Sequence, residues 1–112
     1  MIDPQELSQR AEIVDGLLSY TRGIDRLDKE SVISAFHPGA ILKNYGPEPM
    51  SIEEFVEYAL PSLQKRYAAT QHRVSNIRVE ISQDRALVES YVLAYHIESG
   101  EGPMRLHTFN GR

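Results

Sequence analysis

Five polar residues in mostly apolar stretches are the side chains best placed to do chemistry in this 112-residue chain. They are Tyr20, Asp25, Tyr45, His72 and His96. A carboxylate that accepts a hydrogen bond from one imidazole nitrogen fixes the tautomer of the ring and makes the other nitrogen a usable base near neutral pH. If Asp25 and His72 share a cavity, proton abstraction is the reaction they would support.

Each of these residues also has a simpler explanation. Asp25 stands between Ile24 and Leu27 near the end of an amphipathic segment, and a lone carboxylate at such a place is most often solvated. Tyr20 could be a core aromatic residue whose hydroxyl finds a buried acceptor. His96 could be a structural, hydrogen-bonded histidine. The residue types alone leave both interpretations open.

Two helices are expected to carry the N-terminal candidates. Asp3, Pro4 and Glu6 form a helix start, and apolar residues then recur at helical spacing to about Ile24. Asp28 is the expected cap of a second, short helix that ends at the sequence His-Pro-Gly of residues 37–39. Asp25 therefore belongs to the end of the first helix.

A short strand over residues 40–46 and a third helix follow. Ser51 and Glu54 form a capping box that opens the helix, which continues to residue 67 with a kink expected at Pro61. The residues expected to face inward are Phe55, Tyr58, Ala59 and Leu63.

The chain changes character at about residue 69. Residues 72–81 and 85–97 are rich in β-branched and aromatic side chains, so they predict a long antiparallel hairpin with a turn at residues 82–84. Alternation places Val92, Ala94 and His96 on one face of the second strand. Three helices followed by antiparallel strands predict an α+β fold, with the helices gathered on one side of a curved sheet and residues 1–112 forming a single domain.

Composition excludes several classes of function. The net charge of −4 is spread along the chain, so nucleic acid is a poor candidate partner. The chain has no cysteine and begins with a polar segment, and we expect a cytoplasmic protein without membrane association. The motifs GxxxxGK[ST], GxGxxG, GxSxG and HExxH are absent, and the four histidines lack paired spacing, so we expect neither a cofactor nor a metal.

Two long segments resemble one known family. They are "GLLSYTRGIDRLDKESVISAFHPGAIL" and "ATQHRVSNIRVEISQDRALVESYVLAYH". Together they are similar to the SnoaL-like branch of the nuclear transport factor 2-like superfamily, in particular to the group with scytalone dehydratase, bile acid 7α-dehydratase and hexachlorocyclohexane dehydrochlorinase. The resemblance covers about residues 13–96. It implies a cone of curved antiparallel sheet packed on three helices, with the hollow of the cone as ligand pocket.

The resemblance also implies roles for individual residues. In those lyases an Asp on the last turn of the first helix orients a His at the start of the long hairpin, and that His removes a proton beside a leaving group. The matching positions here are Asp25 and His72, with Tyr20 and Tyr45 matching tyrosines that would polarise a carbonyl or assist a departing hydroxyl. The other residues expected to line the ligand pocket are Phe55, Val92 and His96.

The family pattern usually continues beyond "FNGR" with one or two strands that often supply a pocket Arg or Asn. Here we expect either further strands beyond Arg112 or closure of the sheet in another way, for example by a neighbouring subunit. Because an exposed sheet edge invites pairing with another chain, we expect a homo-oligomer, either a dimer or a trimer.

Two functions are compatible with these observations. The first is a cofactor-independent lyase or isomerase of the dehydratase type, acting on a small apolar or cyclic substrate. The second is a non-catalytic domain of the same superfamily that binds a ligand or takes part in assembly.

Overall fold

The computed structural model describes residues 2–43 and 45–100 and, largely through its backbone, the segment 106–111. Helices and strands follow one another as α1 (Pro4–Asp25), α2 (Lys29–Ser34), β1 (Ile41–Leu42), β2 (Met50–Ser51), α3 (Ile52–Arg66), β3 (Tyr67–Ser82), β4 (Arg85–Glu98) and β5 (Leu106–Gly111). Strands β3, β4 and β5 form an antiparallel sheet, and β1 pairs with β2 in a separate two-stranded sheet.

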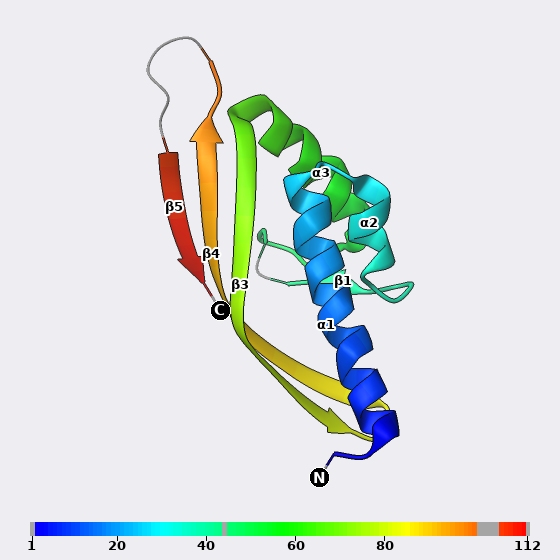
Figure 1. The fold of residues 1–112 in the computed structure, drawn as a ribbon. Helices are drawn as coiled ribbons and strands as arrows, with labels where there is room; N and C mark the ends of the chain where they lie inside the picture. Colours follow the sequence, from blue (N-terminus) through cyan, green and yellow to red (C-terminus); the bar gives the residue numbers. More distant parts are fainter. Residues whose placement is uncertain (1, 44, 101–105, 112) are drawn as a thin grey trace.

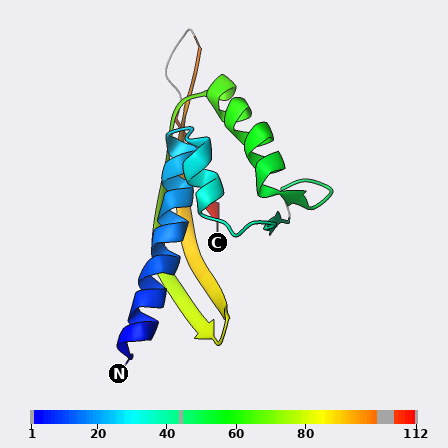
Figure 2. The same cartoon turned by 90° about the vertical axis from the view of Figure 1, so that its right-hand side faces the viewer.

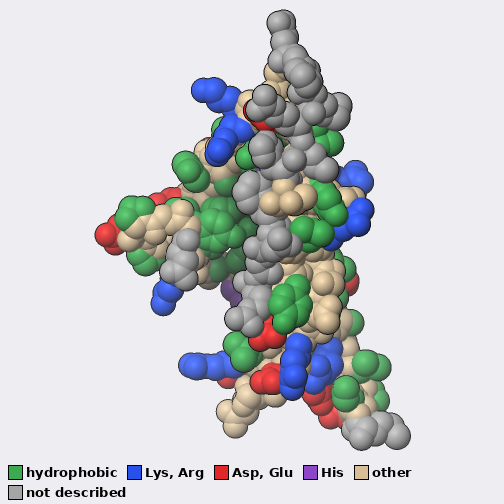
Figure 3. Space-filling model, turned by 90° about the vertical axis from the view of Figure 1, so that its left-hand side faces the viewer, with side chains coloured by type: hydrophobic (Ala, Val, Ile, Leu, Met, Phe, Trp, Pro, Cys, Tyr) green, Lys and Arg blue, Asp and Glu red, His purple; other side chains and the backbone are tan. Residues whose placement is uncertain are grey.

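The helices lie on one side of the three-stranded sheet, which curves along its length (Figure 1). Helix α1 lies against strand β3 of the sheet and α2 packs on α1, whereas α3 and the β1–β2 hairpin form a lobe that stands away from the sheet (Figure 2). Hydrophobic side chains gather in the notch between this lobe and the sheet (Figure 3). The predicted α+β class, with three helices on one side of a curved antiparallel sheet, is confirmed, although only α1 packs closely on the sheet. In the described part of the chain the sheet is not closed into a barrel.

Capping residues set the beginning of each helix as expected. The Asp3 carboxylate accepts from the backbone N–H of Glu6, and the Ser51–Glu54 capping box is present at the start of α3. Asp28 caps α2, and hydrogen bonds from the side chain and backbone N–H of Ser31 lower the pKa of its carboxyl. Only two residues, Arg26 and Leu27, separate this cap from the end of α1.

The main core lies between α2, α3 and the end of α1. Its most completely buried side chains are Val32, Ile52 and Val56. Gly23 lets α2 approach α1, because a Cβ at this position would lie 2.7 Å from Val32 Cγ2 and 2.9 Å from Val32 N. This close contact places the end of α1 firmly against the core.

Three details of the prediction were wrong. Tyr58 does not face inward but is 67% exposed, because the buried face of α3 runs through Ile52, Val56 and Leu60 as well as Phe55. The strand expected at residues 40–46 is reduced to β1 of two residues. The sequence "GPEPM" of residues 46–50 predicts a loop, but Met50 belongs to β2 and pairs with Leu42. The sequence "MRLHTFNGR" of residues 104–112 predicts the opening of a last strand, and β5 covers residues 106–111 of it; residues 104, 105 and 112 lie outside the described residues.

The hairpin and its turn are as predicted, except that β3 begins at Tyr67, five residues before the expected start at residue 72. Strands β3 and β4 are joined at Gln83, whose φ of 56° is that of a tight turn. The register pairs His72 with Ala94 and Thr70 with His96.

None of the helices in the described part of the chain combines the length and the apolar character needed to cross a bilayer.

Candidate active site

Asp25, the last residue of α1, directs its carboxylate at strand β3. Oδ2 accepts the backbone N–H of His72 at 2.9 Å, and Oδ1 accepts the hydroxyl of Thr70 at 3.0 Å. Oδ1 also lies 2.6 Å from Nδ1 of His72. Three donors thus hold one carboxylate, and 45 to 47 residues of chain separate Asp25 from them.

The contact with Asp25 defines the tautomer of His72. A carboxylate has only acceptor oxygens, so Nδ1 of His72 carries the hydrogen of this short bond. In the neutral ring the lone pair is then on Nε2. The side chains of Asp25 and His72 are each only 20% exposed, so water competes weakly for the bond. The arrangement is that of a general base oriented by a carboxylate.

His96 lies beside His72 on the same face of the sheet. Their ring centroids are 5.7 Å apart with an interplanar angle of 71°, as expected for diagonal neighbours in the register. His96 is 8% exposed and also packs edge-on against Tyr67, with centroids 4.6 Å apart. A second imidazole therefore stands next to the Asp25–His72 pair, in a buried position.

Tyr20 and Tyr45 meet through their hydroxyl groups, whose oxygens are 3.3 Å apart. Tyr20 comes from α1 and its ring packs against those of Phe36 and Phe55. Tyr45 comes from the loop after β1, and its ring packs against that of Phe55. Burial, followed by the hydrogen bond with Tyr45, raises the pKa of Tyr20 well above its ordinary value of 10.0. The Tyr20 phenol therefore remains protonated, a hydrogen-bond donor at neutral pH.

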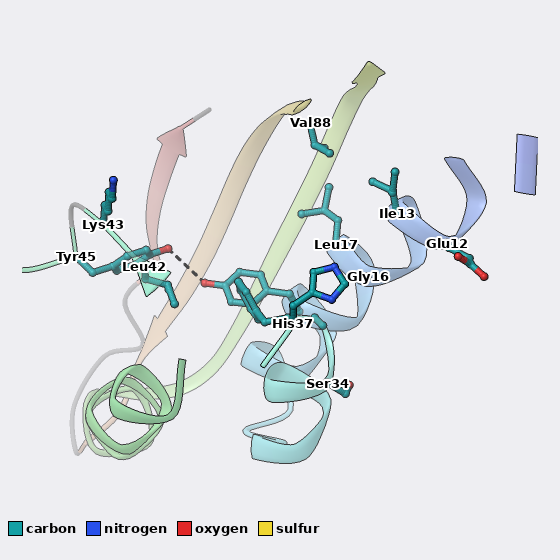
Figure 4. A pocket seen from close by; sticks show the side chains of 13 residues that line it. Glu12, Ile13, Gly16, Leu17, Ser34, His37, Leu42, Lys43, Tyr45 and Val88 are labelled. Carbon is teal, nitrogen blue, oxygen red and sulfur yellow. Dashed lines mark hydrogen bonds between the residues drawn. The ribbon is translucent and has the colours of Figure 1, made fainter. Parts of the chain in front are cut away.

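A cavity of about 690 Å³ opens beside the tyrosine pair, a volume typical of sites for small ligands. It lies between α1, the end of α2, the segment after β1 and the outer part of β4 (Figure 4). The apolar part of its lining includes Ile13, Leu17, Leu42 and Val88. Its polar groups include the two phenols, with His37, Lys43 and Glu12 also on the lining.

The structure divides the predicted site residues into two groups. Tyr20 and Tyr45 line the cavity, whereas Asp25 and His72 form a hydrogen-bonded pair that is not part of its lining. Of the other candidates, Phe55 belongs to the core with 4% exposure, and its ring backs both tyrosines. Val92 and His96 are likewise absent from the cavity lining as far as the structure describes it.

Sequence reasoning missed two features of the site. The hydroxyl of Thr70 shares Oδ1 of Asp25 with His72, and its position two residues before His72 is the signal that places both on one face of the strand. Val88 and Gly16 line the cavity, yet nothing in their local sequence marks them.

In the described part of the chain no three His, Asp or Glu side chains cluster in a way that could hold a metal ion.

Comparison with solved structures reveals the same fold in several proteins. One is a putative scytalone dehydratase from Novosphingobium aromaticivorans, with 21% identity, a TM-score of 0.74 and coverage of 94% of this chain and 71% of that one. Another is LinA, with 17% identity, a TM-score of 0.72 and coverage of 96% and 88%.

A third is the hexachlorocyclohexane dehydrochlorinase LinA-type3 from Novosphingobium barchaimii, with 16% identity, a TM-score of 0.59 and coverage of 96% and 89%. No curated protein matched the sequence. The profile of the SnoaL-like domain matches residues 5–111. With this match over nearly its whole length, and with the fold of the nuclear transport factor 2-like superfamily, the chain belongs to the SnoaL-like domain family.

Proposed function

We propose that the protein is a cofactor-independent lyase or isomerase in which His72 removes a proton from carbon. The observation that carries the proposal is the 2.6 Å contact between Asp25 Oδ1 and His72 Nδ1. It favours the tautomer with the lone pair on Nε2, the form that a general base requires. The putative scytalone dehydratase and the dehydrochlorinase with the same fold are consistent with this class of reaction.

The proposed reaction is an elimination next to a carbonyl group. Nε2 of His72 takes the proton from the carbon, and the electron pair of the broken C–H bond forms a double bond as the hydroxyl departs from the neighbouring carbon with its bonding electrons. The departing hydroxyl takes up a proton from the imidazolium and leaves as water, which returns His72 to its neutral form. Asp25 stabilises the imidazolium that forms, and Thr70 keeps the carboxylate in place. The Tyr20 phenol, protonated at neutral pH, donates to the developing negative charge or to a departing hydroxyl.

The experiment uses cyclic β-hydroxyketones as probes, because loss of water produces an enone that is followed by ultraviolet absorbance. We expect turnover by the wild-type protein and loss of turnover in His72→Gln. Arg73→Gln is the matched control, since Arg73 is the next residue on β3 and is exposed, with its guanidinium 5.0 Å from the Tyr95 ring on the outer face. Full turnover in a correctly folded His72→Gln variant would overturn the proposal.

A non-catalytic ligand-binding domain is the second candidate. It is favoured by the cavity, whose lining contains the tyrosine pair but neither Asp25 nor His72. This alternative predicts that no β-hydroxyketone is converted. It also predicts that His72→Gln binds such compounds as tightly as the wild type does, as measured by calorimetry.

Self-association remains a proposal in either case. Strand β4 exposes Leu87 and Tyr91, at 67% and 47%, on the face opposite to that of Ala94 and His96. Exposed large apolar side chains of this kind are typical of interaction surfaces. Light scattering of the purified protein will show whether it forms the expected dimer or trimer.

A further inference from the structure

Two glycines lie within the described length of helix α1, Gly16 and Gly23, and their surroundings differ sharply. Glycine inside a helix is less favourable than alanine by about 1 kcal/mol, so glycine at each position requires a structural explanation. Gly23 has one, because a Cβ there would collide with Val32 of α2. At Gly16 the nearest atom to an added Cβ is the carbonyl oxygen of Ala35 at 3.8 Å, an ordinary van der Waals contact.

The backbone does not require glycine at position 16 either. Gly16 has the negative φ of a regular helix, unlike Gly39 and Gly100. Neither close packing nor backbone geometry therefore explains the residue. What remains is its place in the cavity lining, where the absence of a side chain leaves space.

Gly16 lies in the middle of the cavity wall that α1 provides. The helix contributes five lining residues, which are Glu12, Ile13, Gly16, Leu17 and Tyr20. From Glu12 to Tyr20 the helix rises about 12 Å, at 1.5 Å per residue. Ile13, Leu17 and Val88 lie near one another on this side (Figure 4). The cavity thus extends from the two phenols along α1 as a slot, with bare backbone at Gly16. Ile13, Leu17 and Val88 form its apolar side, while Glu12, Ser34 and His37 are polar residues of the same lining.

We infer that Gly16 determines ligand length, and that the ligand is an elongated amphiphile. Its hydroxyl or carbonyl group binds at Tyr20 and Tyr45, and an alkyl chain or second ring extends over Gly16 between Leu17 and Val88. This inference rests on the proposed function, because that function places the hydroxyl or carbonyl group of the ligand at the end where the reaction takes place. It adds the substrate class, because a compact single ring would leave the slot empty.

Phenol, 4-propylphenol and 4-heptylphenol are suitable probes, with binding measured by calorimetry. In the wild type we expect the affinity to rise with tail length, by up to about 4-fold per buried methylene. Gly16→Leu fills the slot, so the gain on going from phenol to 4-heptylphenol should be lost while phenol itself still binds. Gly16→Ala, whose Cβ makes only the ordinary contact with Ala35, should lose part of the gain and fold at least as stably as the wild type.

Ser8→Leu is the matched control, because it adds the same side chain to an exposed position of α1 outside the cavity lining. It should keep the wild-type dependence on tail length. Equal dependence on tail length in the wild type and Gly16→Leu would overturn the inference, as would a wild-type affinity that does not change with tail length. The binding series needs no turnover, so its failure is distinguishable from failure of the His72→Gln experiment.

Discussion

The two ends of the site are built in different ways. At the Asp25 end, one carboxylate accepts three hydrogen bonds from β3, one of them from the backbone. At the cavity end, the two phenols share a single 3.3 Å hydrogen bond, and apolar side chains supply most of the remaining wall. The first arrangement requires particular atoms at particular places, whereas the second requires mainly volume and shape. Under the proposed function, we therefore expect proton abstraction to depend on the first arrangement and ligand selection to depend mainly on the second.

The largest effect is expected from Asp25→Asn, which tests whether the two ends are separable. The amide cannot hold His72 as the carboxylate does, so we expect turnover of a β-hydroxyketone probe to fall on the order of 10⁴-fold. Nitrogen-15 NMR of the His72 ring should show loss of the preference for hydrogen on Nδ1. Binding of phenol at the cavity end should be unchanged.

Asp15→Asn is the control for this variant, because Asp15 is an exposed residue of the same helix. It should keep wild-type turnover and the wild-type nitrogen-15 spectrum of His72. If Asp25→Asn weakens phenol binding as much as it lowers turnover, the Asp25 end and the cavity end do not act independently.

A smaller effect is expected at Thr70. Thr70→Val keeps the shape of the side chain but removes its hydrogen bond to Asp25, and one such bond contributes about 1 kcal/mol. We expect kcat to fall by about 5- to 10-fold with little change in KM. Thr70→Ser retains the hydroxyl and should restore most of the loss. Equal activities of the Val and Ser variants would show that the hydroxyl has no part in positioning Asp25.

The smallest effect concerns the cavity end and depends on pH. The pKa of Tyr20 is raised in the folded protein, so above pH 10 the unfolded chain releases a proton that the folded chain retains. Stability is then lost as pH rises beyond 10.0, the ordinary value of the group. Tyr20→Phe removes this contribution, and its free energy of unfolding should fall less between about pH 8 and pH 11 than that of the wild type.

Urea unfolding at the two pH values measures this difference. Turnover of Tyr20→Phe at neutral pH should decrease far less than that of Asp25→Asn, because the phenol assists the reaction but does not accept the proton. A parallel fall of stability with pH in Tyr20→Phe and wild type would contradict the assignment of a retained proton to Tyr20.

Much of this arrangement could be predicted from local patterns. Caps at Asp3, Asp28 and Ser51 set the beginnings of the helices, and each is confirmed. Alternation along the hairpin assigned the faces of β4, and Ala94 and His96 are buried on one of them. The contact between Asp25 and His72 was inferred from the resemblance to the SnoaL-like family, and the 2.6 Å distance agrees with it.

Other features depended on how the elements pack. Helical periodicity alone gave Tyr58 an inward position, but α3 turns Ile52 and Val56 to the core and leaves Tyr58 exposed. Val92 and Phe55 were expected in the ligand pocket. The lining of the described cavity contains neither; Val88 is the lining residue from β4, and Phe55 packs behind Tyr45.

The sequence by itself determined the order of the three helices and the long hairpin, the helix caps, the faces of the hairpin and the family. These properties depend on interactions between residues a few positions apart or on patterns repeated along one element. Tertiary structure alone decided that Thr70 binds Asp25, that Tyr20 meets Tyr45, and that Gly16 borders a slot while Gly23 touches Val32. The physical reason is that these contacts join segments distant in sequence, where the distance between atoms depends on the relative placement of whole elements.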